Sequence, residues 1–200
     1  MKKRLVSILL VLVMVLGMFP TVAAAADAPT EITSAEEFAT MPASGDYILK
    51  ADIIITAPYG NNFSGTFDGD GHTVTLDITG TANYVGMFKN LTGAAGKTVT
   101  VKNVILAGKI DAASRGNVGG IAGFANPYSG PIKIENCKNT ATIIAKEKVG
   151  GILGSCQSDA NEVSVIGCGN TGTITASGYY AGGIVGNLAA GQTIDSCSNS

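Results

Sequence analysis

Hydrophobic and polar residues alternate in short runs along most of the chain. In one such run, Ile132 and Ile134 alternate with Lys133 and Glu135. A period of two residues is typical of a β-strand that buries one face. Similar runs predict further strands at residues 47–56, 63–67 and 73–78, and from residue 99 onward. No helical segment of about 10–15 residues separates these runs, so the pattern excludes a TIM barrel and a Rossmann fold.

Two sequence phrases recur at a nearly fixed distance. The first reads Val/Ala-Gly-Gly-Ile-x-Gly, and its copies begin at Val118, Val149 and Ala181, which are 31 and 32 residues apart. A fainter copy begins at Val85. The second phrase, Cys-x-Asn followed by Thr or Ser, has the same period. Two phrases with one shared period indicate stacked repeats, and the spacing is too long for leucine-rich repeats.

One repeat, taken as residues 132–154, contains three short strands and three corners. We expect its strands at 132–135, 140–144 and 149–156, with an Asn-rich turn at 136–139 and a charged corner at 146–148. Three strands per coil predict a right-handed parallel β-helix. Stacked coils place equivalent residues about 4.8 Å apart. The alignment therefore predicts three inward-facing ladders: Val101, Ile134, Val165 and Ile194; Ile110, Ile143 and Ile174; and Ile121, Ile152 and Ile184.

The N-terminus has the pattern of a secretory signal peptide at residues 1–26. Three basic residues precede an apolar run at 5–19, and the small residues at 22–26 end in an Ala-x-Ala cleavage pattern. A membrane anchor is the alternative. However, 15 residues are fewer than the roughly 20 that span a bilayer. No cysteine directly follows the run, which argues against a lipid-anchored lipoprotein.

We expect the mature chain to divide into a linker, an N-terminal part with a cap and irregular coils, and a part with regular repeats: residues 27–33, 34–98 and 99–200. Ser34 and Glu37 have the spacing of a capping box, which predicts a short helix over residues 34–41. A helix at this place would cover the strand edges of the first coil.

Composition narrows the range of partners. Removal of residues 1–26 takes three of the 13 basic residues, which leaves 10 against 15 acidic residues and a net charge of −5. The chain has no basic stripe to neutralise phosphates, so nucleic acid is not an expected partner. A mature chain of this length fits one domain.

The sequence Asp68-Gly69-Asp70-Gly71 has two interpretations. Clustered carboxylates suit calcium, but the remaining ligands of an EF-hand loop are missing. Asp-Gly is also a common tight-turn pair between strands, and we favour a turn. The adjacent His72 is the single histidine. A zinc-protease helix needs two, so we expect His72 to pack half-exposed beside the turn.

The four cysteines occupy aligned repeat positions. Cys137, Cys168 and Cys197 share one position, at which the preceding coil has Val104. The fourth, Cys156, aligns with Ala125 and Leu188. An even number of cysteines in a secreted chain suggests disulfides. Parallel side chains on stacked coils suit a disulfide poorly, however, so we expect buried free thiols.

Many parallel β-helices are polysaccharide lyases or hydrolases, so an enzyme is an open alternative. Arg115 is the single arginine of the mature chain, and the acidic residues lie at different corners: Asp111, Glu135, Glu147, Asp159 and Glu162. A glycosidase needs two carboxyl groups about 5–10 Å apart, which neighbouring coils could supply. The sequence identifies no catalytic, cofactor-binding or metal-ligating residue.

Loops at equivalent places offer a possible binding edge. Residues 124–131, 155–162 and 187–192 should line up along one side of the solenoid. Tyr128 lies in the first of these loops, and Tyr179 and Tyr180 lie at another corner. Aromatic side chains on such a ridge can stack on sugars, although single exposed tyrosines are common.

The run Phe-Ser-Gly-Thr-Phe-Asp-Gly-Asp-Gly-His-Thr-Val at residues 63–74, followed by the Val-Gly-Gly-Ile-x-Gly repeats, resembles the GLUG-motif proteins. These are bacterial secreted or surface proteins with repetitive β-helical regions. They include adhesins and stalk regions of some immunoglobulin-A-cleaving peptidases. The resemblance covers nearly all of residues 30–200. It implies the repeat type and a structural role for the motif residues, and it implies no catalytic residue.

We therefore expect a non-catalytic secreted or cell-surface β-helix that adheres, binds or acts as a spacer. Its expected partners are host or cell-wall glycans or surface proteins, with no cofactor. The alternative is a polysaccharide lyase or glycoside hydrolase. The last copy of the second phrase stops at its corner, at Ser200. This predicts further coils beyond Ser200, or end-to-end pairing of the open coil with a second molecule.

Overall fold

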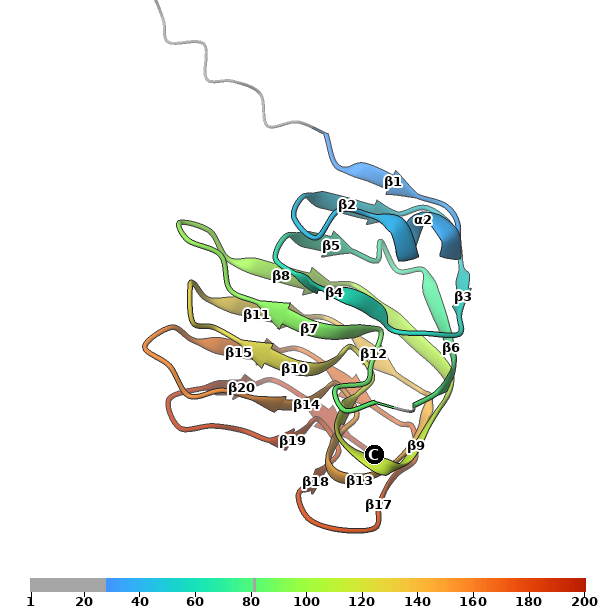
Figure 1. Ribbon diagram of the computed structural model, residues 1–200, viewed down its shortest axis with the longest axis vertical. Coiled ribbons are helices and arrows are strands. Elements are labelled where there is room, and N and C mark those ends of the chain that lie inside the picture. The colour runs from blue at the N-terminus through green and yellow to red at the C-terminus, as the bar shows by residue number, and fades with distance from the viewer. Residues whose placement is uncertain (1–27, 81) are drawn as a thin grey trace, which may run out of the picture.

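The computed structural model describes residues 28–80 and 82–200, which form a solenoid of parallel β-strands (Figure 1). These described residues make about five turns and contain almost no helix. The predicted all-β parallel solenoid is therefore confirmed. The predicted signal peptide at residues 1–26 lies outside the described residues. In the described part of the chain, no helix is both long and apolar enough to cross a membrane.

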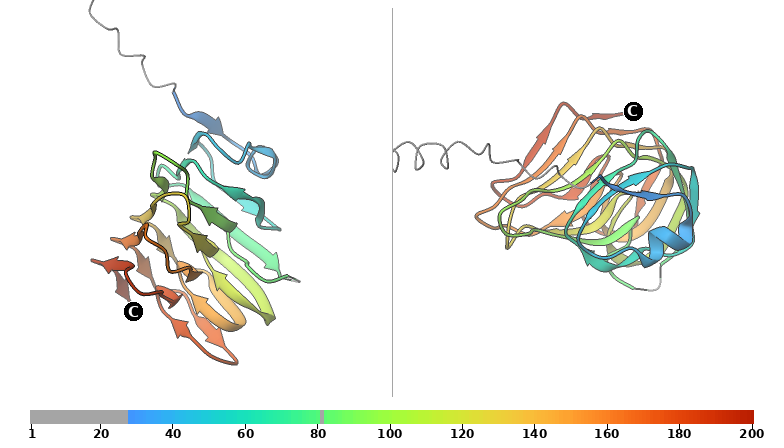
Figure 2. Two further views of the ribbon diagram at one scale, coloured as in Figure 1. Left: turned by 60° about the vertical axis from the view of Figure 1, so that its left-hand side comes forward. Right: turned by 90° about the horizontal axis from the view of Figure 1, so that it is seen from above.

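Each coil passes through three parallel sheets in the same order. Sheet 1 contains β1 (Thr30–Ile32), β2 (Asp46–Leu49), β5 (Thr66–Asp68), β8 (Val99–Lys102), β11 (Ile132–Glu135), β15 (Val163–Ile166) and β20 (Thr193–Asp195). Sheet 2 contains β3 (Ile53–Ile55), β6 (Thr73–Thr79), β9 (Ile105–Gly119), β12 (Lys138–Asn139), β13 (Thr142–Gly150), β16 (Gly169–Asn170), β17 (Ile174–Ala176), β18 (Ala181–Gly182) and β21 (Ser198–Asn199). Sheet 3 contains β4 (Tyr59–Phe63), β7 (Phe88–Thr92), β10 (Ala122–Asn126), β14 (Leu153–Cys156) and β19 (Val185–Asn187). Seen along the solenoid, the coils lie over one another (Figure 2).

The strand registers and the corner hydrogen bonds confirm the stacking in the three predicted ladders, but Ile194 in the last coil does not face inward, since its side chain is 42% exposed. In sheet 1, Ile134 lies between Val101 and Val165, and Val165 pairs with Ile194. In sheet 2, Ile143 lies between its two predicted neighbours, Ile110 and Ile174. The third ladder lies at a corner, where the amide of each isoleucine donates to the isoleucine carbonyl of the next coil: Ile121 to Ile152 and Ile152 to Ile184, both at 2.9 Å.

Two predicted strands are each divided by a corner. Residues 47–56 form β2 and β3, which belong to different sheets, and residues 63–67 form the end of β4 and the start of β5. The second corner depends on close backbone packing. A Cβ at Gly65 would overlap the carbonyl oxygen of Gly45 in the preceding coil.

The corners of the 132–154 repeat also differ from the prediction. The charged segment 146–148 does not end a strand, because β13 continues through it with a bulge between Ala145 and Glu147. Lys148 turns this strand by adopting a left-handed backbone, with φ of 52°. The predicted strand 149–156 is instead broken between β13 and β14, where Gly151 and Ile152 form the corner.

The N-terminal end has the predicted helix. Helix α2 (Ala35–Thr40) begins after Ser34, whose Oγ accepts a hydrogen bond from the amide of Glu37 at 3.2 Å. The carboxylate of Glu37 accepts from the amide of Thr33 at 2.7 Å rather than from that of Ser34. The segment expected to be a linker, residues 27–33, includes β1, which pairs with β2.

Aromatic side chains fill the first coils and hold the helix in place. The ring of Phe38, from α2, lies 5.6–5.8 Å from the rings of Tyr59, Phe67 and Phe88. All four side chains are almost fully buried. The helix therefore covers the end of the solenoid and extends its core (Figure 2).

The two repeated phrases meet inside the solenoid. Asn139 and Asn170 are buried, and the Nδ2 of Asn139 donates to the Oδ1 of Asn170 at 2.7 Å. The Nδ2 of Asn170 donates in turn to Asn199 at 2.7 Å. A Cβ at Gly151 would lie 2.6 Å from the Oδ1 of Asn170. The asparagine of one phrase thus requires the second glycine of the other, which explains why both phrases have one period.

We expect Ile152→Asp to unfold the solenoid, because Ile152 is fully buried and the new carboxylate would have no partner. The loss in the free energy of unfolding should exceed about 4 kcal/mol. Ile54→Asp is the matched control, because the Ile54 side chain is 63% exposed. Thermal melting followed by circular dichroism measures both, and wild-type melting of Ile152→Asp would contradict the ladder assignment.

We expect Asn170→Ala to lower stability by about 1–3 kcal/mol, because it leaves the buried amide of Asn139 without its partner and also removes the hydrogen bond to Asn199. Urea denaturation measures the change. Thr171→Ala, at the exposed neighbouring position, serves as the control and should stay within about 0.5 kcal/mol of the wild type. An equal effect of both substitutions would argue against the amide ladder.

Candidate functional site

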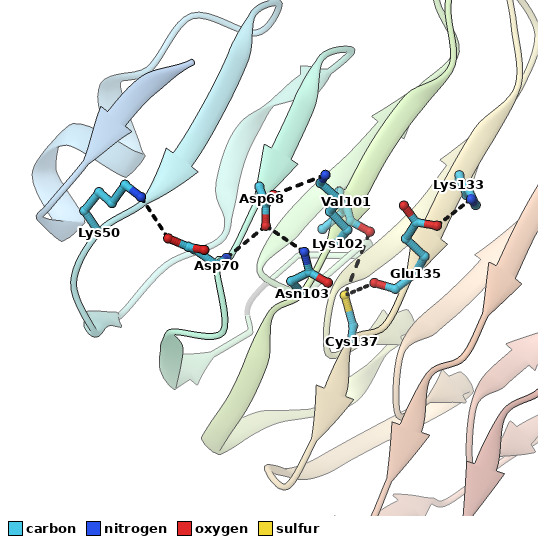
Figure 3. Close-up of polar contacts among 9 residues, drawn as sticks. All are labelled: Lys50, Asp68, Asp70, Val101, Lys102, Asn103, Lys133, Glu135 and Cys137. Atoms are coloured by element: carbon cyan, nitrogen blue, oxygen red, sulfur yellow. Dashed lines mark hydrogen bonds and ion pairs between the residues drawn. The ribbon is translucent and has the colours of Figure 1, made fainter. Parts of the chain in front are cut away.

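A row of charged and amide side chains follows the corner between sheets 1 and 2 (Figure 3). The Oδ1 of Asp68 accepts hydrogen bonds from the amide of Asp70 and from the Nδ2 of Asn103, each at 2.9 Å. The Nζ of Lys102 lies 3.2 Å from the other oxygen of Asp68. The Nζ of Lys50 lies 2.8 Å from the Oδ2 of Asp70. These contacts tie three successive coils together at the corner.

This geometry favours the turn interpretation of residues 68–71. Asp70 and Gly71 have left-handed φ values of 51° and 80°, which suit a tight turn. Both carboxylates face lysine partners from neighbouring coils. Within residues 28–80 and 82–200, no three His, Cys, Asp or Glu side chains form a group that could hold a metal ion.

The row continues on the outer face of sheet 1 with alternating charge. Asp68 pairs in register with Lys102, and Lys102 with Glu135. Glu135 also forms an ion pair with Lys133 of its own strand. Opposite charges on neighbouring strands stabilise pairing modestly, since the side chains are partly exposed.

His72 packs half-exposed beside the turn, as predicted. Its Nδ1 lies 3.2 Å from the Oδ1 of Asp52, and its side chain is 34% exposed. The same oxygen of Asp52 accepts a hydrogen bond from the amide of Thr73 at 2.8 Å. These hydrogen bonds, the one from Thr73 first, lower the pKa of Asp52. The pair therefore fixes the corner between β2 and β3 onto the next coil.

The acidic residues considered for catalysis lie on several elements. Asp111 belongs to β9, where Lys109 lies 2.8 Å from it, and Glu147 belongs to β13. Glu135 lies in β11, and Asp159 and Glu162 lie in the loop between β14 and β15. The Nε of Arg115, in β9, is buried and makes no hydrogen bond within the described residues. The structure therefore brings none of these acids into the corner row except Glu135.

The cysteines form the aligned stack that the repeats predict. The amide of Cys168 donates to the Sγ of Cys197 at 3.4 Å, and the Sγ of Cys137 donates to the carbonyl of Glu135 at 3.4 Å (Figure 3). Cys156 pairs in register with Ala125. All four cysteines are free thiols. Burial raises the pKa of Cys137, which keeps this thiol protonated and unreactive.

The predicted loop edge is also present. The loop after β10 contacts the loop after β14, where the Nδ2 of Asn161 donates to the carbonyl of Tyr128 at 3.3 Å. The loop after β14 contacts the loop after β19, through Ser158 and the carbonyl of Ala190 at 3.4 Å. Tyr128 is 71% exposed on this edge. The loops therefore support one another along this edge.

A hollow of about 270 Å³, which was not predicted from the sequence, lies where sheets 2 and 3 meet in the first two coils. Its lining includes Thr56, Pro58, Gly60, Thr79, Tyr84 and Lys89. The signal was present in the fainter copy of the first phrase. That copy is one residue shorter than the others and has Lys89 where they have their last glycine.

The comparisons with known proteins add no relative. No family model matches the chain. No curated protein and no solved structure matches it either.

We expect Asp68 to contribute stability that is lost in acid. Burial raises the pKa of Asp68, but hydrogen bonds from the Asp70 amide, Asn103 and Lys102 lower the pKa by more than burial raises it. The pKa of Asp68 is therefore below its ordinary value. The unfolded chain, with an Asp pKa of about 3.9, then binds the proton more readily. The stabilisation is thus present above about pH 4 and is lost as the pH falls through the folded-state pKa.

Asp68→Asn should therefore melt at a lower temperature than the wild type at neutral pH and lose less stability between about pH 5 and pH 2. Melting temperatures across this pH range measure the effect. Asp159→Asn, in a loop of the other edge, is the control and should keep the wild-type profile. Identical pH profiles for wild type and Asp68→Asn would refute the role of the corner row.

Proposed function

We propose that the protein is a non-catalytic binding module of the GLUG type, secreted to the bacterial cell surface, which adheres to glycans or surface proteins or separates other modules. The observation that carries this proposal is that the residues repeated in every coil serve packing. The glycines, the isoleucines and the buried asparagines all pack coil against coil. The motif thus builds a rigid rod and leaves recognition to the outer side chains.

The outer face supports this role through its spacing. Successive strands repeat about every 4.8 Å, so the solenoid presents equivalent outer side chains at a constant interval. Such a surface suits an extended polymer, which can contact several coils at once. The many weak contacts then add to a useful affinity.

The N-terminal pattern supports secretion. A basic start, an apolar run and small residues before residue 27 are typical of a signal peptide. The acidic balance of the mature chain argues against nucleic acid as the partner and suits an extracellular surface.

The test is an adhesion assay with the purified secreted protein on immobilised pectin, mucin, host glycans and cell-surface proteins. We expect retention on at least one of these surfaces and no release of shortened sugar into solution. The Ile152→Asp variant, which should be unfolded, is the control for non-specific retention. Release of sugar products would support the enzyme alternative, and no retention on any surface would contradict adhesion in favour of a spacer.

A further inference from the structure

The last glycine of the first phrase is required by the coil that precedes it. A Cβ at Gly154 would lie 2.6 Å from the carbonyl carbon of Asn117, and one at Gly123 would lie 2.6 Å from that of Tyr84. Tyr84 and Asn117, which directly precede a copy of the phrase, both have a left-handed backbone. Each lies against the sheet 3 strand of the next coil, β10 for Tyr84 and β14 for Asn117. This cover leaves no room for a side chain at the glycine.

The strand β7 departs from this rule. Its Lys89 pairs in register where β10 has Gly123. The preceding coil cannot cover it, because the chain reaches Tyr59 of β4 only four residues after Ile55 of β3. The equivalent path in the next coil, from Leu76 to Phe88, takes 12 residues. The missing cover leaves the hollow, and the lysine occupies the position that packing otherwise reserves for glycine.

The chemistry of the hollow favours an anionic, hydroxyl-rich ligand. Among the described residues, Lys89 makes no ion pair and no Asp or Glu lines the hollow. Thr56 and Thr79 bring two hydroxyl groups to the lining. An unpaired ammonium group beside neutral hydroxyls is complementary to a carboxylate that carries neighbouring sugar hydroxyls.

Tyr84 presents a partly exposed aromatic ring to the same ligand. Its ring packs against Phe124 with centroids 5.3 Å apart and remains 37% exposed. It has a left-handed backbone, with φ of 63°, as do the equivalent residues of the later coils, which are Asn117, Lys148 and Tyr180. The position therefore accepts side chains of different chemistry. A ring held on one side and free on the other can stack on a sugar.

We propose that this hollow binds one carboxylated pyranose unit of an acidic polysaccharide. Lys89 pairs with the carboxylate, Thr56 and Thr79 bind sugar hydroxyls, and Tyr84 stacks on the ring. The volume of about 270 Å³ lies just below the ~300–1,000 Å³ of pockets for drug-sized ligands, which suits a single sugar unit. The inference rests on the proposed function and names its binding site.

The test is calorimetric titration of the purified protein with trigalacturonate and with its methyl ester. We expect the ester, which lacks the carboxylate charge, to bind at least about tenfold more weakly. Lys89→Gln should weaken trigalacturonate binding about tenfold, and Lys89→Arg should restore most of it. Tyr84→Asn, which installs the residue of the next coil, should weaken binding of both sugars.

Lys97→Gln and Lys146→Gln are the matched controls, because they make the same change as Lys89→Gln at exposed positions outside the hollow. Both should bind as the wild type does, and melting temperatures should show that every variant is folded. The absence of trigalacturonate binding, equal binding of acid and ester, or wild-type binding by Lys89→Gln would each overturn the site. Equal binding of hexaglutamate would overturn the sugar assignment.

The adhesion assay distinguishes a failure of the proposed site in the hollow from a failure of the proposed function as a binding module. Retention on glycans that Lys89→Gln leaves unchanged would overturn the hollow as the site but preserve a binding module. Loss of retention in the same variant would support both.

Discussion

The structure depends on close contact between backbones at the corner where sheet 2 passes into sheet 3. At this corner the path of one coil lies against the next so closely that a Cβ at Gly154 would meet the Val118 amide nitrogen at 2.6 Å. The contact holds the stacked coils in register, because a shift of one residue would place a side chain where only glycine fits. The isoleucine ladder and the asparagine ladder then continue from coil to coil through hydrogen bonds.

This constraint explains which parts of the fold were predictable. Ladders such as Ile110, Ile143 and Ile174 follow from local alternation repeated at one period, and α2 follows from the spacing of Ser34 and Glu37. The corners inside residues 47–56 and 149–156 were not predictable from local sequence. In the first run, Lys50 and Asp52 stand at alternate positions, as outward-facing residues of one strand would. The second corner is formed by a backbone contact with the next coil. Such contacts link residues about 30 positions apart.

The candidate site was less predictable for the same reason. Lys50 and Asp70 are 20 residues apart, and Asp68 and Asn103 are 35 apart, so only the stacking of coils brings them together. The sequence identified residues 68–71 as a turn but did not identify their partners. It also showed that Val85 begins an imperfect copy. Only the strand register shows that Lys89 replaces a glycine.

An imperfect copy in a stack of regular ones has a physical meaning. A lysine side chain at the position of Gly123 would collide with the coil before it, so Lys89 is compatible with the solenoid only because residues 56–58 take a shorter path. Lys89 in place of glycine and the shorter path of residues 56–58 compensate each other and therefore belong to one feature. Regular coils use their repeated residues for packing and have none of them left for recognition. A coil that departs from the repeat exposes side chains that the others cannot have, and it is there that a solenoid of this kind can acquire a specific ligand.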